Sequence, residues 1–265
     1  DPLWSRGLGD VYKRQLIRPY ISKMTNSELM TVMVGGFSTV AGSVMALYVT
    51  WLNNIPEIAG HLLAASVMSA PAALMVAKII YPETKSYQII NSNSIKLKSQ
   101  DNNLVDAIGR GATDGLKLAA NVAAMLIAFI SLVAMINFIL SLLGTSMQEM
   151  LGLLFKPLAW TMGIPWADAK IVGTLMGEKI VLTELIAFRD LSDYVSNNTI
   201  SERSVIIASY ALCGFANFGS IGIQLGGIGS MAPKRKKDLS KLVFKAMLGG
   251  AIASWLTASI VGILI

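Results

Sequence analysis

The sequence contains one cysteine, one histidine and few charged residues. Cys213 alone cannot form an internal disulfide or a multi-cysteine metal or redox motif. His61 alone leaves no histidine pair for metal chemistry. Only 14% of the 265 residues are charged, against about 25% in an ordinary soluble domain. Because 54% are hydrophobic, a soluble domain could not bury them all. The composition excludes a soluble enzyme, a disordered chain and a disulfide scaffold.

Several enzyme motifs are also missing from the sequence. There is no G-x-x-x-x-G-K-S/T motif for ATP, no H-E-x-x-H, no G-x-S-x-G and no carboxylate pair suited to glycoside hydrolysis. Energy for any transport would therefore come from an ion gradient or from the solute. A membrane enzyme is the alternative outside transport, and it would need a catalytic set such as Asp106 and Asp114 with His61, which shows no known spacing.

Residues 1–15 differ in composition from the rest of the chain. They are polar, and they lack both a helical apolar stripe and the apolar core of a secretory signal. We interpret 1–15 as a foreign lead and 16–265 as the C-terminal region of a longer membrane protein, with a native polar loop as the alternative for 1–15.

Five apolar stretches have the length, about 20 residues, that a membrane-spanning helix needs. The sequence therefore predicts an all-α polytopic membrane protein. The fourth stretch is rich in glycine, so we expect its helix to break. The stretches are 31–52, 61–81, 118–144, 204–233 and 247–265.

Two further apolar stretches are interrupted. Residues 151–164 contain Lys156 and Pro157, which favours a partial or interfacial helix. Residues 170–189 hold several charges among apolar residues, which would be costly in a full span. A re-entrant hairpin buried in protein tolerates them better. We therefore expect irregular structure over 147–191.

The basic residues of 234–245 predict the orientation in the membrane. This loop separates the last two spans, and basic loops remain in the cytoplasm, so the C-terminus is expected outside. We expect the plasma membrane, which in a bacterium is the inner membrane. The alternative is that these basic residues form a patch that binds nucleic acid or anionic lipid. Their position between two spans favours a role in setting the membrane orientation, and we expect no nucleic-acid partner. Residues 104–117 mix apolar and charged positions and predict a separate interfacial helix.

Small residues line the stretch 31–44, including Gly36 and Gly42. They allow close helix packing. They also allow an unwound segment whose carbonyl and hydroxyl groups hold a hard cation. Spacing alone leaves both interpretations open.

Glu184 is a carboxylate in apolar surroundings. It could bond a polar substrate, carry a proton, or pair with Lys179 or Arg189, and such groups inside a membrane are functional candidates by default. Glu178 has a simpler structural role available, because Lys179 is its neighbour, although adjacent residues point to different sides of a helix.

The stretch 210–229 places Asn217 and Ser220 on one helical face between glycines. A helix broken there could bind hydroxyl groups of a polar solute. Hydrogen bonding between helices in a glycine-rich seam is the alternative.

These stretches resemble the concentrative nucleoside transporter family. The resemblance includes GEKIVLTELIAF at 177–188 and ALCGFANFGSIGIQLGGIGSMAP at 211–233, and its motifs occur in order over nearly all of 16–265. It implies helices with re-entrant hairpins around a central site, assembled as a homotrimer. It also implies nucleoside uptake by alternating access coupled to Na⁺ or H⁺, with no other cofactor. A carrier of another polar solute is the alternative within transport.

The resemblance also implies a role for individual residues. Glu184 corresponds to the carboxylate that bonds the ribose, with Asn217 and Ser220 as its partners. The apolar contact to the nucleobase corresponds to Val44, and the cation ligands correspond to Thr39 and Val40.

The chain departs from the family pattern in two places. The family's Gly-Gln-Thr-Glu-Ala-Pro motif, which reads the nucleobase, belongs where 1–15 stand, so we expect the chain on its own to transport nothing. The family's Asn-Glu-Phe pattern is replaced by Thr183, Glu184 and Leu185, which keeps the carboxylate.

Overall fold

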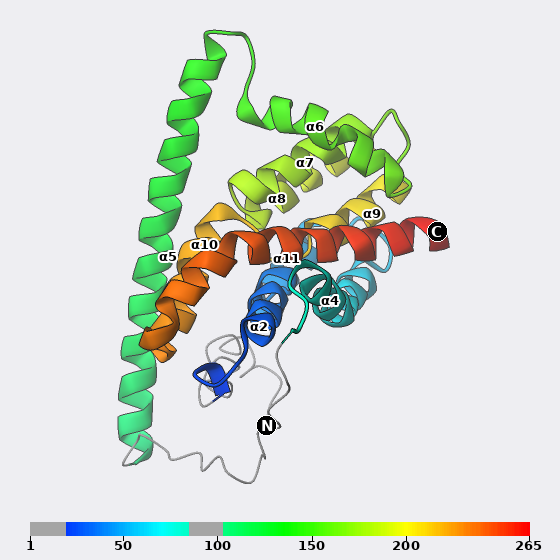
Figure 1. Ribbon diagram of the computed structural model, residues 1–265. Coiled ribbons are helices and arrows are strands. Elements are labelled where there is room, and N and C mark those ends of the chain that lie inside the picture. Colours follow the sequence, from blue (N-terminus) through cyan, green and yellow to red (C-terminus); the bar gives the residue numbers. More distant parts are fainter. Residues whose placement is uncertain (1–19, 85–102) are drawn as a thin grey trace.

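A computed structural model describes residues 20–84 and 103–265, and within these ranges the chain forms helices and no strand (Figure 1). The predicted lead, 1–15, lies outside the described residues. The helices are α2 (Asn26–Ser38), α3 (Gly42–Trp51), α4 (Ile58–Ile80), α5 (Leu104–Ser141), α6 (Met147–Thr161), α7 (Ala169–Val181), α8 (Glu184–Ser196), α9 (Glu202–Leu212), α10 (Phe218–Met231), the short 3₁₀ helix η3 (Pro233–Arg235) and α11 (Lys236–Leu264).

Three described segments are long and apolar enough to cross a membrane. They are Asn26–Trp51, which contains α2 and α3, Ile58–Ile80, which is α4, and Pro233–Leu264, which contains α11. They coincide with the first, second and last predicted spans. The prediction of an all-α polytopic membrane protein is confirmed.

Two helices are broken inside the protein. Residues 39–41 separate α2 from α3, with the backbone extended at Thr39 (φ −106°, ψ 152°) and at Ala41 (φ −71°, ψ 138°). Residues 213–217 separate α9 from α10, in the glycine-rich stretch where a break was predicted. The break at 39–41 shows that residues 31–44 do not form one continuous helix, as the unwound interpretation expected, while cation binding there stays a prediction.

The two breaks touch each other at Gly214. This residue has φ +111°, a conformation that favours glycine. A Cβ added there would lie 2.9 Å from the carbonyl oxygens of Phe37 and Ser38, at the end of α2. Segments nearly 180 residues apart therefore meet through a glycine backbone.

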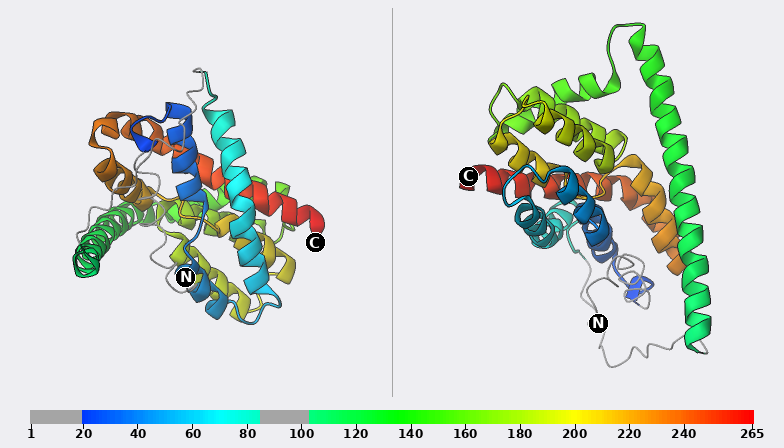
Figure 2. Two further views of the ribbon diagram at one scale, coloured as in Figure 1. Left: turned by 90° about the horizontal axis from the view of Figure 1, so that it is seen from below. Right: turned by 180° about the vertical axis from the view of Figure 1, so that it is seen from behind.

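Helix α11 packs against α2, α4 and α9 and joins the two halves of the described chain (Figures 1 and 2). Two of its glycines allow the close approach. A Cβ on Gly250 would overlap Phe37 of α2, and one on Gly262 would overlap the carbonyl oxygen of Met162 at the end of α6. Small residues give helices in membranes this kind of contact.

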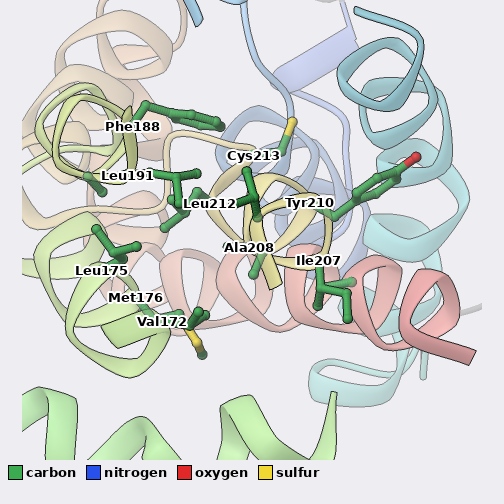
Figure 3. Packing of buried hydrophobic residues seen from close by; sticks show 14 of the residues in the cluster. Val172, Leu175, Met176, Phe188, Leu191, Ile207, Ala208, Tyr210, Leu212 and Cys213 are labelled. Carbon is green, nitrogen blue, oxygen red and sulfur yellow. The ribbon is translucent and has the colours of Figure 1, made fainter. Parts of the chain in front are cut away.

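Helices α7 and α8 form the hairpin predicted for 170–189. Each has 13 residues, or about 20 Å, which is too short to cross a hydrocarbon core of about 30 Å. They turn at residues 182–183. The inner sides of α7, α8 and α9 share one apolar cluster, which includes Met176, Phe188 and Leu212 (Figure 3).

The interfacial helix predicted for 104–117 is wrong as a separate element. Residues 104–141 form one continuous helix, α5, of 38 residues, about 57 Å long. Residues 104–141 contain no proline, and the glycines at 109, 111 and 115 have open space around them. Nothing in this stretch therefore forces the helix to break. Helix α5 runs along one edge of the molecule, where α10 and α6 contact it (Figures 1 and 2).

The basic stretch 234–245 is helical, so its prediction as a loop is wrong. It contains part of η3 and the first turns of α11. The reason is an apolar stripe, because Leu239, Leu242 and Val243 are buried at helical spacing. Arg235 fixes the start of α11, donating to Asp238 Oδ2 at 2.7 Å and to the Met24 carbonyl at 2.7 Å.

The turn before α7 is tied to α9 by Asp168, outside the three candidate spans. Its Oδ2 accepts from Ser201 Oγ at 2.6 Å and from Ser204 Oγ at 2.7 Å. Partial burial acts to raise the pKa of the Asp168 carboxyl, but these hydrogen bonds outweigh it and hold the pKa below its ordinary value.

We expect Gly262→Ala to destabilise the chain by about 1–3 kcal/mol, because the new methyl group overlaps the Met162 carbonyl and forces α11 from α6. Thermal unfolding in detergent measures the effect. Gly226→Ala on α10 is the control, since its Cβ meets nothing within 4 Å. Equal melting temperatures for the two variants would contradict the packing described here.

We expect Asp168→Asn to lower the melting temperature at neutral pH. A carboxyl whose pKa is depressed by folding stabilises the fold above its ordinary pKa of about 3.9 and loses that contribution as the pH falls through the folded value. The difference between wild type and variant should therefore shrink on acidification. Glu202→Gln, at an exposed carboxylate of α9, serves as control, and a difference that stays constant with pH would refute the role of the Asp168 charge.

Candidate functional site

Glu184 is the first residue of α8, at the turn of the hairpin, and only 4% of it is exposed. Thr183 caps the helix, since its side-chain oxygen accepts from the backbone N–H of Ile186 at 3.4 Å. Threonine and asparagine are both good N-cap residues, so the departure from the family's Asn-Glu-Phe pattern preserves the cap. The positive end of the α8 dipole favours a negative charge at this place.

Asn217 connects Glu184 to a second helix. Its Nδ2 donates to Glu184 Oε2 at 3.0 Å, and its Oδ1 accepts from the backbone N–H of Ser220 at 2.7 Å. Asn217 is thus the N-cap of α10, and both it and Ser220 are buried. The N-termini of α8 and α10 converge on one buried carboxylate, an arrangement in which broken helices bind polar solutes.

Lys179 does not pair directly with Glu184. Its Nζ donates to the carbonyls of Ala211 at 2.9 Å and Cys213 at 3.2 Å, and the side chain is fully buried. Ser254 of α11 also donates to the Cys213 carbonyl, at 2.5 Å. These donors satisfy carbonyls that the end of α9 leaves free. The Lys179 charge acts on Glu184 from a distance, and Arg189 is exposed.

An aromatic residue that the sequence analysis did not single out lies beside Glu184. Tyr48 of α3 is fully buried and stacks on Phe188 of α8, with ring centroids 3.9 Å apart. Its hydroxyl interacts electrostatically with Glu184 but has no hydrogen-bond partner among the described residues. Val44, one turn earlier on the same face of α3, is half-buried. That spacing from Val44 is the signal that could have identified Tyr48.

The predicted cation ligands lie in the break between α2 and α3. The Thr39 hydroxyl donates to the Gly35 carbonyl at 3.0 Å. The first hydrogen bond of α3 runs from the backbone N–H of Met45 to the carbonyl of Ala41, at 3.0 Å. The carbonyls of Thr39 and Val40 come before this one in the chain, outside the hydrogen bonds of α3. Within the described residues no three His, Cys, Asp or Glu side chains gather. Any ion here would therefore be held by carbonyl and hydroxyl oxygens, and its binding stays a prediction.

Broken helices around a buried carboxylate, in a fold with long apolar helices, are an architecture typical of membrane transporters. The family described as "Na+ dependent nucleoside transporter C-terminus" matches residues 61–262. The chain belongs to this family, as the resemblance predicted.

Curated relatives match almost the whole chain. "Solute carrier family 28 member 3" is 43% identical in Eptatretus stoutii and 40% identical in Homo sapiens, in each case over 97% of this chain and 40% of the relative. "Sodium/nucleoside cotransporter 1" of Mus musculus is 42% identical over 94% of this chain and 41% of its own length. The chain thus spans about two fifths of these relatives. Because they are named as transporters, the membrane-enzyme alternative is wrong.

Solved structures agree with the fold. CNTnw in an inward-facing, substrate-bound state is 42% identical, with a TM-score of 0.79 over 93% of this chain and 59% of that chain. A CNTnw variant in an outward-facing state is 41% identical, with a TM-score of 0.76 over the same shares. The similarity includes the hairpin and the broken helices, because it covers nearly all of the described residues.

We expect Thr183→Ala to destabilise the hairpin by about 1 kcal/mol, because it removes the cap of α8, whereas Thr183→Asn should leave stability nearly unchanged. Unfolding of the purified chain in detergent compares the two variants. If both substitutions have the same effect, the side-chain cap does not stabilise α8.

Proposed function

We propose that the chain is the solute-binding region of an ion-coupled nucleoside carrier that works by alternating access. The observation that carries the proposal is the hydrogen bond between Asn217 and Glu184, buried where the N-termini of α8 and α10 meet. The names of the relatives, which are sodium/nucleoside cotransporters, support the solute class.

The polar groups of this site match the chemistry of a ribose. Vicinal hydroxyl groups can donate to the Glu184 carboxylate, while the hydroxyl of Ser220 and the amide of Asn217 can both donate and accept. A hydrogen bond to a charged group contributes about 1.5–3 kcal/mol, against about 0.5–1.5 kcal/mol for a neutral pair. Glu184 is therefore the strongest contact in the proposed site, and Val44 supplies an apolar surface for the base.

We propose Na⁺ as the coupling ion, held by the Thr39 hydroxyl and by the carbonyls of Thr39 and Val40. The description of the family and the names of its relatives support sodium. The extended backbone at 39–41 supplies the oxygen atoms that a hard cation prefers. Since this break touches the α9–α10 break at Gly214, an ion there would lie next to the segment that leads to Asn217.

We propose that the carrier is a homotrimer in the bacterial plasma membrane, with 234–245 on the cytoplasmic side and the C-terminus outside. The basic residues at the start of α11 support this orientation. The exposed apolar side chains of α5, among them Leu132, Phe138 and Ile139, support a surface that faces lipid or another subunit.

Uptake is best measured in a chimera in which this chain replaces the region of CNTnw that it matches. In proteoliposomes, Glu184→Gln should reduce uridine uptake about tenfold or more, since an amide is a weaker acceptor than a carboxylate. Glu202→Gln, at an exposed carboxylate, is the matched control. Undiminished uridine uptake by Glu184→Gln would remove the proposed role, and uptake of a different polar solute in place of uridine would identify another carrier.

Thr39→Ala in the same chimera should raise the sodium concentration needed for half-maximal uptake several-fold, because it removes one oxygen ligand. Thr50→Ala, at an exposed hydroxyl of α3 that bonds its own helix, controls for loss of a threonine. The measurement compares a sodium gradient with a proton gradient of equal size. Uptake that a proton gradient alone drives, with no need for sodium, would reject Na⁺ as the coupling ion.

A further inference from the structure

Glu178 of α7 is a buried carboxyl group that the proposed transport site does not use. Only 9% of it is exposed, and its Oε2 is buried without a hydrogen-bond partner among the described residues. Its neighbour Lys179 points away, toward the carbonyls of Ala211 and Cys213. The structural role considered for Glu178, pairing with Lys179, is therefore not available.

The Glu178 carboxyl interacts across the packed hairpin with another carboxyl, that of Asp190 on α8. The two are close enough to share a hydrogen bond across the hairpin. Two ionised carboxylates only accept hydrogen bonds. They would therefore repel each other in partly dry surroundings, and a single proton removes the conflict by making one of them a donor.

Other charges around the pair do not neutralise it. Asp193, on the same helix as Asp190, adds negative charge. Arg189 is exposed and acts on Asp190 more weakly than Glu178 does. Tyr194 is a neutral neighbour. Two basic groups on the helices packed against the hairpin are engaged elsewhere. Lys156 of α6 lies 4.0 Å from the centre of the Trp166 ring, and Arg203 of α9 donates to the carbonyls of Gly163 and Gly262.

We propose that Glu178 and Asp190 form a proton-binding site, in which one proton shared between the two carboxyl groups fastens α7 to α8. The ligand is a proton and not a metal ion, because a hard cation takes about six or more oxygen ligands and the pair offers two carboxyl groups. Loss of the proton leaves two negative charges facing each other and separates the two helices.

The proton site affects solute binding through the hairpin itself. Glu184 is the first residue of α8, and Phe188, between Glu184 and Asp190, stacks on Tyr48. Separation of α7 and α8 would displace the carboxylate proposed to bind ribose. This effect on uptake rests on the proposed function, whereas the proton site itself does not.

Infrared spectroscopy of the chimera tests the site without any transport. At neutral pH we expect the C=O stretch of a protonated carboxyl, which shifts in D₂O, is lost in Glu178→Gln, and persists in Glu202→Gln and in Glu184→Gln. If no such band disappears in Glu178→Gln, the pair holds no proton. If addition of Na⁺ removes the band, the pair is a cation site and the proposal is overturned.

Uptake against pH tests the consequence. Wild-type uptake should fall several-fold as the pH rises and the proton is lost, while Glu178→Gln, whose amide donates the same hydrogen bond without titrating, should keep its uptake at high pH. Glu178→Ala should lower the melting temperature at neutral pH, because it removes the donor. An identical pH profile in wild type and Glu178→Gln would overturn the link to uptake. If the chimera takes up no nucleoside at all, the proposed function fails, and the infrared band still decides the proton site.

Discussion

The hydrogen bond from Asn217 Nδ2 to Glu184 Oε2 joins the two places where short helices begin inside the protein. A lone carboxylate at this depth would be costly. Here the amide donor, the N-termini of α8 and α10 and the nearby charge of Lys179 all compensate the same negative charge. The rest of the described structure holds these elements in place.

Helix breaks are tolerable in a membrane only if the freed backbone groups find partners. At the end of α9 the partners are Lys179 and Ser254, which come from two different helices. At the starts of α8 and α10 they are Thr183 and Asn217. Polar side chains in this region thus have two functions, because they repair the backbone and shape the site. This explains why a fully buried lysine stands so close to a proposed solute site without being its direct partner.

Much of this arrangement could be predicted from the sequence. The charges in 170–189 predicted the hairpin because they could not face lipid, and the glycines of 204–233 predicted a break. Periodicity could not show that α5 continues through 104–117, since a mixed polar and apolar pattern suits both an interfacial helix and the end of a long one. The basic residues of 234–245 also led to the prediction of a loop at the start of α11, where the buried leucines stabilise a helix.

Other contacts depend on how helices face each other, which one sequence does not reveal. Tyr48 reaches Glu184 only because α3 packs against α8. Asp190 meets Glu178 only because the hairpin places residues twelve positions apart on facing sides. No sequence motif indicates either pairing. In the sequence Phe188 lies between Glu184 and Asp190, and its ring, stacked on Tyr48, fixes α8 against α3.

The absence of a side chain at Gly214 has a mechanical consequence. With backbone lying directly on backbone, no flexible group is present to absorb relative motion between the chain near Thr39 and the chain leading to Asn217. In the proposed alternating access, we therefore expect these two segments to move together. The proposed solute site and ion site would then move together through this direct backbone contact, without a chain of side chains between them.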